Sequence, residues 1–171
     1  MSDELIYSGR VVTLRLKRLR QPDGRTFVRE IVEHAPGAAI VAVDDARNVL
    51  LVRQHRPAAA ADLLELPAGI VDPGEEPLQT ARRELEEETG FSADRVQPLA
   101  RFYSSPGFCT EVLYVFLATG LRACESARDQ EEALELVRMP LADAIATVLT
   151  GELSDAKTIT GLLAYWRSLQ S

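Results

Sequence analysis

Cysteine is scarce in this 171-residue chain, and long hydrophobic runs are absent. The two cysteines, Cys109 and Cys124, are too few for a disulfide framework and are typical of ordinary thiols in a reducing compartment. No apolar run approaches the roughly 20 residues that a membrane-spanning helix needs. The N-terminal segment MSDELIYSGR is acidic and mixed, whereas a signal peptide is basic and then apolar. These absences predict a cytoplasmic protein without a membrane partner.

The charge of the chain is unbalanced toward acid. There are 19 Lys and Arg residues against 26 Asp and Glu residues, for a formal net charge of −7. An acidic chain repels DNA, RNA and anionic membranes unless it carries a basic patch or bound cations. The sequence therefore predicts no nucleic-acid partner and raises the question of bound metal. With 46% apolar and 26% charged residues, the composition is that of a globular protein, and the length suits one compact domain.

Alternating apolar and polar residues predict strands in the first third of the chain. The alternation covers residues 12–19, a turn rich in Pro and Gly follows at 21–25, and residues 26–34 return as the second strand of a hairpin. Residues 39–43 and 49–54 form another predicted hairpin. Because these two segments are largely apolar on both faces, we expect them at the centre of a sheet.

A helix is predicted over residues 77–89, because Pro77 suits its first position and Gly90 suits the position after its end. The other expected elements are a short extended piece at 63–69, strands at 96–103, 112–118 and 134–137, and helices at 141–149 and 155–169. The apolar side of the last helix carries Ile159, Leu162, Leu163 and Trp166. This order predicts a single α+β or mixed α/β domain whose N-terminal hairpin stands apart.

The excess negative charge is concentrated between residues 72 and 88, on the predicted helix and the loop that enters it. At about 100° per residue, the helix face that borders the apolar stripe carries Glu84, Glu87 and Glu88. Carboxylates clustered beside a core are unfavourable unless a cation or an arginine compensates them. Two explanations fit this pattern: a solvated face paired with the neighbouring arginines, or a site for Mg²⁺ or Mn²⁺, which prefer oxygen ligands.

The segment 69–91 resembles the Nudix box, a motif of glycines, glutamates and an arginine at fixed spacing. Its specified positions are all present as Gly69, Glu75, Arg83, Glu84, Leu85, Glu87, Glu88, Gly90 and Phe91. Segments outside the box resemble the ADP-ribose pyrophosphatases of this family, namely 28–30, 34–38, 53–56, 65–69, 160–162 and Pro106 in its proline loop. We expect Gly69 and Gly90 to serve backbone turns.

The resemblance to the Nudix family implies an α/β/α sandwich with a mixed central sheet between helices. Residues 1–36 would form an N-terminal β-hairpin arm for dimerisation and substrate contact, and residues 37–171 would form the Nudix hydrolase domain. The family likeness also implies a homodimer whose subunits exchange their N-terminal hairpins.

A divalent metal site is also implied by the resemblance. Its ligands would be the backbone carbonyl of Ala68 and the carboxylates of Glu84, Glu88 and Glu132, with Mg²⁺ or Mn²⁺ as the ion. Glu87 would share an ion or hold a water, and Arg83 would orient the glutamates by bidentate pairing. In the acidic loop 129–134, Glu131 or Glu132 would supply a further ligand or the general base, and we take Glu132 as the ligand.

The substrate site implied by the resemblance includes Arg56, whose planar guanidinium suits phosphate oxygens. Arg29 and Glu30 would contact the adenine or the terminal ribose. The proline loop and the residue before the next strand would add Ser105, Pro106, Gly107 and Glu111. Simpler explanations are a surface ion pair for Arg56 and ordinary strand-face positions for Arg29 and Glu30.

The function implied is that of a Mg²⁺-dependent ADP-ribose pyrophosphatase, which splits ADP-ribose, a nucleotide sugar, into AMP and ribose 5-phosphate. Two alternatives stay open. One is a Nudix hydrolase of another nucleoside diphosphate derivative, such as GDP-mannose or a dinucleoside polyphosphate. The other is a module that senses ADP-ribose without cleaving it, although a pure sensor has no need of the full set of glutamates.

Overall fold

The structure, a computed structural model, describes residues 3–124 and 134–170. Its strands are β1 (Asp3–Ser8), β2 (Val12–Arg20), β3 (Thr26–His34), β4 (Gly37–Val43), β5 (Asn48–Arg56), β6 (Ala61–Glu65), β7 (Ala68–Ile70), β8 (Phe91–Tyr103), β9 (Val112–Ala123) and β10 (Glu135–Pro140). Its helices are α1 (Pro77–Thr89), α2 (Leu141–Thr150) and α3 (Ala156–Ser168). None of the helices in these ranges is long and apolar enough to cross a membrane.

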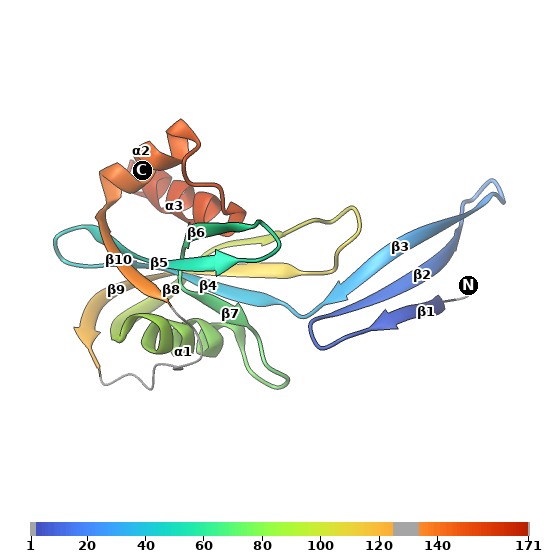
Figure 1. Ribbon diagram of the computed structural model, residues 1–171, viewed down its shortest axis with the longest axis horizontal. Coiled ribbons are helices and arrows are strands. Elements are labelled where there is room, and N and C mark those ends of the chain that lie inside the picture. The colour runs from blue at the N-terminus through green and yellow to red at the C-terminus, as the bar shows by residue number, and fades with distance from the viewer. Residues whose placement is uncertain (1–2, 125–133, 171) are drawn as a thin grey trace.

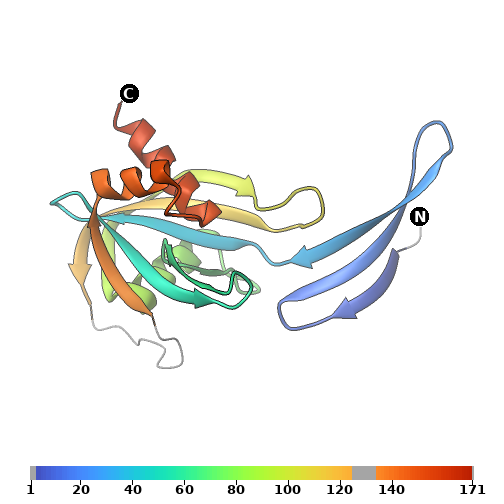
Figure 2. The same cartoon turned by 45° about the horizontal axis from the view of Figure 1, so that its top comes forward.

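The body of the molecule is a seven-stranded mixed sheet with helices on both faces (Figure 1). Five strands follow the order β10-β5-β4-β9-β8, while β6 pairs with β5 and β7 pairs with β4. Strand β4 is parallel to β9, and the other pairings are antiparallel. Helix α1 covers one face of the sheet and helices α2 and α3 cover the other (Figure 2). The predicted α+β fold with a mixed sheet between helices is confirmed.

Strand β4 lies inside this sheet and is buried along its whole length. Successive side chains alternate between the two faces. The cluster beneath α2 and α3 contains Ala39, Val41 and Val43. The cluster beneath α1 contains Ala38, Ile40 and Ala42. Because each fully buried valine or isoleucine contributes about 1.5–3 kcal/mol, this strand anchors both layers, and the predicted central position of residues 39–43 is confirmed.

Helix α1 begins and ends where the local signals indicate. A proline occupies its first turn, and Glu76 with Gln79 forms a capping box at its start. Gly90 ends the helix in the left-handed region at φ 74°. The helix buries Ala81 and Leu85 against the sheet, so the acidic residues beside them are held at the margin of the core.

Helix α3 turns a different face to the core from the predicted one. Its buried residues are Thr158, Gly161, Leu162 and Tyr165. Leu163 and Trp166, by contrast, are 38% and 37% exposed. Gly161 favours this face, because a Cβ there would lie 2.7 Å from Leu66 and the helix backbone therefore approaches the sheet closely. The predicted apolar side is right for Leu162 and for Ile159, which packs against the core while partly buried, and wrong for Leu163 and Trp166.

The N-terminal strands form an arm that stands to one side of the body (Figure 1). The arm is a three-stranded antiparallel sheet in the order β1-β2-β3, so the predicted hairpin gains a strand that was not foreseen. Every residue of β1 is exposed, and none of β2 or β3 is fully buried. The arm therefore has no hydrophobic core of its own.

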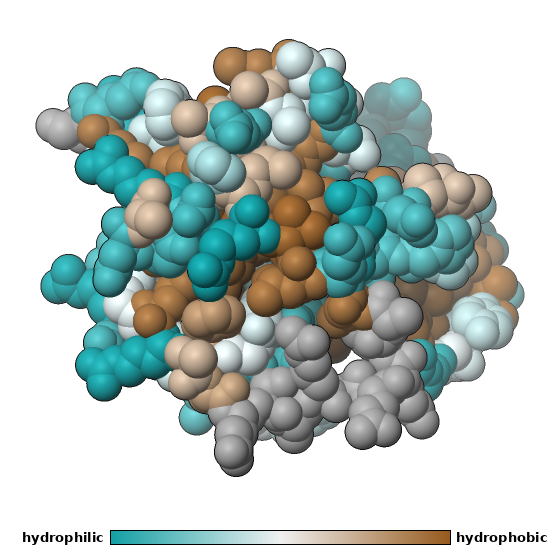
Figure 3. Space-filling view, turned by 60° about the vertical axis from the view of Figure 1, so that its left-hand side comes forward, coloured by the Kyte–Doolittle hydropathy of each residue, from teal (hydrophilic) through white to brown (hydrophobic). Residues whose placement is uncertain are grey.

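The end of the body opposite the arm shows apolar side chains gathered between polar ones (Figure 3).

Two backbone hydrogen bonds tie the arm to the loop that follows β8. The Val32 amide donates to the Phe108 carbonyl at 2.8 Å, and the Thr110 amide donates to the Val32 carbonyl at 3.0 Å. The His34 amide also donates to the Thr110 hydroxyl at 3.0 Å. The outer edge of β3 is thus partly paired with this loop, which places the proline loop beside the arm.

Candidate active site

Arg83 is the centre of a charged cluster on α1. Its Nε and Nη2 donate to the two carboxylate oxygens of Glu75, at 3.2 Å each. Its Nη1 donates to Glu84 at 2.7 Å and to Glu87 at 2.9 Å. The hydrogen bonds that Arg83 donates to Glu75, together with the charge of Glu84 and the hydrogen bonds to Glu87 and Glu84, raise the pKa of the Arg83 guanidinium. One arginine thus offsets the mutual repulsion of three carboxylates and orients them.

Glu88 is the buried member of the acidic face. It is 9% exposed, and its Oε2 accepts a hydrogen bond from the Ala68 amide at 3.0 Å. Strand β7 carries Ala68 to this position because it pairs with β4 and contacts α1. The structure therefore brings together two predicted metal ligands. The observed contact uses the amide N–H of Ala68, whereas its carbonyl was the group predicted to bind metal.

The Glu84 carboxylate packs directly against Gly69 of β7, which has no side chain. A Cβ at Gly69 would lie 1.8 Å from Oε1 of Glu84, far closer than two such atoms can approach. The φ of Gly69 is not positive, whereas Gly90 has a φ of 74°. The backbone turn predicted for Gly90 is confirmed. The one predicted for Gly69 is wrong, because this glycine serves the close approach of Glu84 to β7.

The chemistry of this acidic face fits a divalent ion, since carboxylate oxygens are the donors that Mg²⁺ prefers. In the part of the chain that the structure describes, however, no three acidic, histidine or cysteine residues are arranged to hold a metal. Acids of α1 bond instead to Arg83 and to the amide of Ala68. Glu131 and Glu132, predicted as ligand or base, lie outside the described residues.

A second charged cluster surrounds Glu65, which was not among the predicted site residues. Glu65 is 2% exposed, and Arg56 donates to its two oxygens from Nε and Nη2 at 2.8 and 2.7 Å. Lys157 of α3 forms an ion pair with the same carboxylate. Burial alone would raise the pKa of Glu65, but the bonds and charges of Arg56 and Lys157 outweigh it and lower this pKa. The one sequence signal for Glu65 was its place in the family-like segment 65–69.

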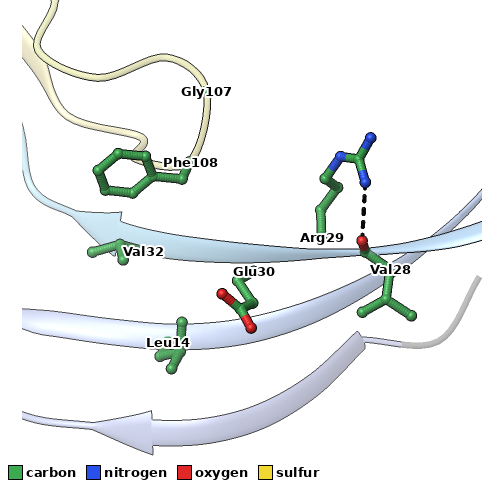
Figure 4. A pocket seen from close by; sticks show the side chains of 7 residues that line it. All are labelled: Leu14, Val28, Arg29, Glu30, Val32, Gly107 and Phe108. Atoms are coloured by element: carbon green, nitrogen blue, oxygen red, sulfur yellow. Dashed lines mark hydrogen bonds between the residues drawn. The ribbon is translucent and has the colours of Figure 1, made fainter.

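Three of the predicted substrate residues line one pocket between the arm and the proline loop. The lining consists of Leu14, Val28, Arg29, Glu30, Val32, Gly107 and Phe108 (Figure 4). Arg29 and Glu30 project from opposite sides of β3 (Figure 4), and the Arg29 guanidinium lies 4.4 Å from the centre of the Phe27 ring. The cavity of about 550 Å³ has the size of a small-molecule site.

The other predicted substrate residues of this region lie in or next to the loop without lining the pocket. The Ser105 carbonyl accepts from the amides of Phe108 and Cys109 at 3.1 and 2.8 Å, which closes the turn around Pro106. Glu111 lies at the base of the arm, 3.4 Å from Nδ1 of His34. The structure thus groups the arm with the proline loop and, in another part of the molecule, groups α1 with β7 (Figure 1).

Comparison with known proteins identifies the family. Residues 33–162 match the family model of the NUDIX domain. An ADP-ribose pyrophosphatase of Bacillus subtilis (strain 168) is 41% identical over 160 residues, which cover 92% of this chain and 86% of that protein. An ADP-ribose pyrophosphatase of Mycobacterium tuberculosis is 41% identical over 167 residues, covering 96% of this chain and 81% of that protein.

A solved structure supports the same assignment at the level of the fold. The crystal structure of an ADP compounds hydrolase superposes with a TM-score of 0.89 and covers 99% of this chain and 92% of that one. At 24% sequence identity, this likeness establishes the fold alone. Together with the family match over 33–162 and the complete Nudix box over 69–91, these findings show that the chain belongs to the Nudix family.

Proposed function

We propose that this protein is a divalent-metal-dependent hydrolase that cleaves the pyrophosphate of ADP-ribose, or of a related ADP-sugar, to give AMP and ribose 5-phosphate. The observation that carries the proposal is the carboxylate face of α1, which Arg83 orients and which Gly69 allows to lie against β7. The choice of substrate rests on the two relatives named ADP-ribose pyrophosphatase, which match nearly the whole chain.

The metal ligands in this proposal are Ala68, Glu84, Glu88 and Glu132, with Mg²⁺ as the ion and Mn²⁺ as a substitute. A bound divalent ion supplies positive charge that offsets the pyrophosphate and lowers the pKa of a water. Arg83 keeps Glu84 and Glu87 oriented, which reduces the reorganisation needed on binding. Glu87 shares an ion or holds the attacking water, and Glu131 or Glu132 takes up its proton. The water oxygen bonds to one phosphorus, and the bond from that phosphorus to the bridging oxygen breaks.

The substrate residues in this proposal divide between the body and the arm. In the body, Arg56 donates to the pyrophosphate. In the arm region, Arg29 and Glu30 contact the adenine or the terminal ribose, in the pocket that they share with Gly107. Ser105, Pro106 and Glu111 shape the adjoining loop.

We further propose that the protein is a homodimer in which the arm of one subunit completes the site of the other. The arm exposes Leu5, Ile6, Tyr7, Val11 and Val28. A single-layer sheet with no core leaves these apolar side chains hydrated, which favours their burial against a second copy of the chain. A partner's arm would also supply Arg29 and Glu30 to the acidic face of α1. Light scattering tests this proposal, because a mass near the 18.8 kDa of one chain would contradict it.

The cytoplasm is the proposed location. Both Cys109 and Cys124 are free thiols, which suits a reducing compartment. Cell fractionation with an antibody against the protein tests this assignment, and recovery with a secreted or membrane fraction would contradict it.

A substrate panel in Mg²⁺ tests the activity, with products separated by chromatography. We expect AMP and ribose 5-phosphate from ADP-ribose and little turnover of nucleoside triphosphates. Preferential cleavage of GDP-mannose or of a dinucleoside polyphosphate would mean that the enzyme's substrate belongs to that class instead. Binding of ADP-ribose without hydrolysis of any panel member, in Mg²⁺ or in Mn²⁺, would identify a sensing module and overturn the enzyme proposal.

A further inference from the structure

Glu65 is a buried carboxylate outside the acidic face of α1. It is 2% exposed, and a charged carboxylate is unfavourable in such a place unless cations pair with it. Arg56 and Lys157 both do so, and their side chains are 41% and 11% exposed. The pair with Lys157 is therefore an inner contact, whereas the pair with Arg56 extends from the buried carboxylate to the surface.

Residues of the first turn of α3 bind both Glu65 and the residue that follows it. Lys157 also lies 3.1 Å from Asp155, and Asp155 caps the helix by accepting from the Thr158 amide at 3.0 Å. The Thr158 hydroxyl accepts from the amide of Leu66, the residue next to Glu65, at 2.8 Å. The Glu65 carboxylate at the end of β6 and the backbone of Leu66 after it are thus both fixed to one helix end, so Glu65 is a rigid anchor.

Arg56 is bound to this anchor by one edge of its guanidinium. The edge formed by Nε and Nη2 is used by Glu65, and Nη1 has no partner among the described residues. Besides Glu65, the charges of Asp155 and Glu88 raise the pKa of Arg56. Glu88 belongs to the acidic face of α1, so the guanidinium lies within electrostatic range of that face. A planar group fixed by one edge presents its other donors in one direction.

We propose that Glu65 is a positioning residue, which holds Arg56 so that Nη1 is presented to the pyrophosphate of the substrate, and that Lys157 holds Glu65 in turn. This inference rests on the proposed function, in which Arg56 contacts the pyrophosphate. It adds that the binding of the pyrophosphate by Arg56 depends on Glu65, which itself does not contact the substrate. Without the anchor, the long arginine side chain would sample several rotamers, and binding would have to restrict them.

The test is a double-mutant cycle of Arg56→Gln and Glu65→Gln, with Glu65→Asp as the conservative variant. The dissociation constant of ADP-ribose is measured by calorimetry with a chelator present, and kcat and KM are measured with Mg²⁺. Asp94→Asn is the matched control, because Asp94 also accepts two hydrogen bonds from one arginine, Arg122, but in an exposed pair on β8 and β9. Circular dichroism checks that each variant folds.

We expect Glu65→Gln to weaken ADP-ribose binding and to raise KM by about five- to tenfold, with a smaller change in kcat. Added to Arg56→Gln, it should weaken binding by less than about twofold more, because both changes remove one interaction. Glu65→Asp should recover part of the loss, and Asp94→Asn should bind as the wild type does. If Glu65→Gln does not fold, Glu65→Asp is combined with Arg56→Gln and should show the same lack of additivity.

The positioning role would be overturned if the fold-changes of Arg56→Gln and Glu65→Gln in the dissociation constant multiplied fully in the double mutant. Unchanged binding in folded Glu65→Gln would overturn it as well. A wild-type protein that cleaves no ADP-ribose would instead overturn the proposed function. In that case, binding of inorganic pyrophosphate across the same cycle decides whether Glu65 positions Arg56. Additive effects on pyrophosphate binding would reject this inference independently of the enzyme's substrate.

Discussion

Oε1 of Glu84 lies 1.8 Å from the point where a side chain on Gly69 would begin. The same oxygen accepts a hydrogen bond from Arg83 at 2.7 Å. Strand β7 and helix α1 therefore determine jointly where this carboxylate lies. Gly69, the first position of the Nudix box, and Glu84, about two-thirds of the way along it, are therefore in direct packing contact.

Gly69→Ala should damage both folding and activity. The added methyl would overlap the Glu84 carboxylate, so either β7 or the side chain must shift. We expect the free energy of unfolding to fall by about 1–3 kcal/mol and kcat to fall at least about tenfold, measured by urea denaturation and steady-state kinetics. Gly107→Ala is the control for stability alone, since a Cβ there meets nothing within 4 Å. A Gly69→Ala protein with wild-type stability would contradict the packing.

Glu84→Gln and Glu88→Gln should each lower kcat at least about a hundredfold, because a neutral amide is a poor ligand for a divalent ion. The fold should persist, which circular dichroism checks. Glu86→Gln is the matched control, since Glu86 lies on the same helix but is exposed and belongs to neither cluster. Wild-type activity in Glu88→Gln would remove that residue from the proposed metal site.

Arg29→Ala should raise KM for ADP-ribose about tenfold and change kcat by less than about threefold, because in the proposed function the arm pocket would bind the substrate away from the reacting phosphorus. Arg18→Ala serves as the comparison. Arg18 is an exposed arginine of the same arm, on β2, and is not part of the pocket lining. Equal effects of the two substitutions would mean that the arm acts through its overall charge and not through the pocket.

Glu65 should make the stability of the fold depend on pH. Burial opposes its charge, but the pairs with Arg56 and Lys157 lower its pKa below the ordinary 4.5. Its contribution is therefore present above the unfolded-state pKa and is lost as the pH falls through the lower folded-state pKa. Denaturation at a series of pH values should show that the free energy of unfolding of the wild type falls more steeply below about pH 4.5 than that of Glu65→Gln. Parallel pH profiles of the free energy of unfolding for the two proteins would contradict a stabilising role of the ion pairs of Glu65.

Local signals predicted much of the fold and one half of the candidate site. The bounds of α1 follow from Pro77 and Gly90, because capping and helix termination depend on a few adjacent residues. The shared face of Glu84, Glu87 and Glu88 follows from the helical period alone. The central strand β4 follows from its unbroken apolar run. In each case the deciding interactions lie within a few residues along the chain.

Contacts between distant segments required the tertiary structure. Glu65 and Lys157 are 92 residues apart, and they meet because α3 packs across the sheet beside β6. The buried face of α3 depends on Gly161, whose missing side chain lets the helix approach Leu66. The role of Gly69 likewise depends on a glutamate from another element. The sequence by itself determined the acidic helix and its family, since these depend on local spacing. Only the packing of helices on the sheet decided which charges are buried together, because desolvation and ion pairing depend on distance in space.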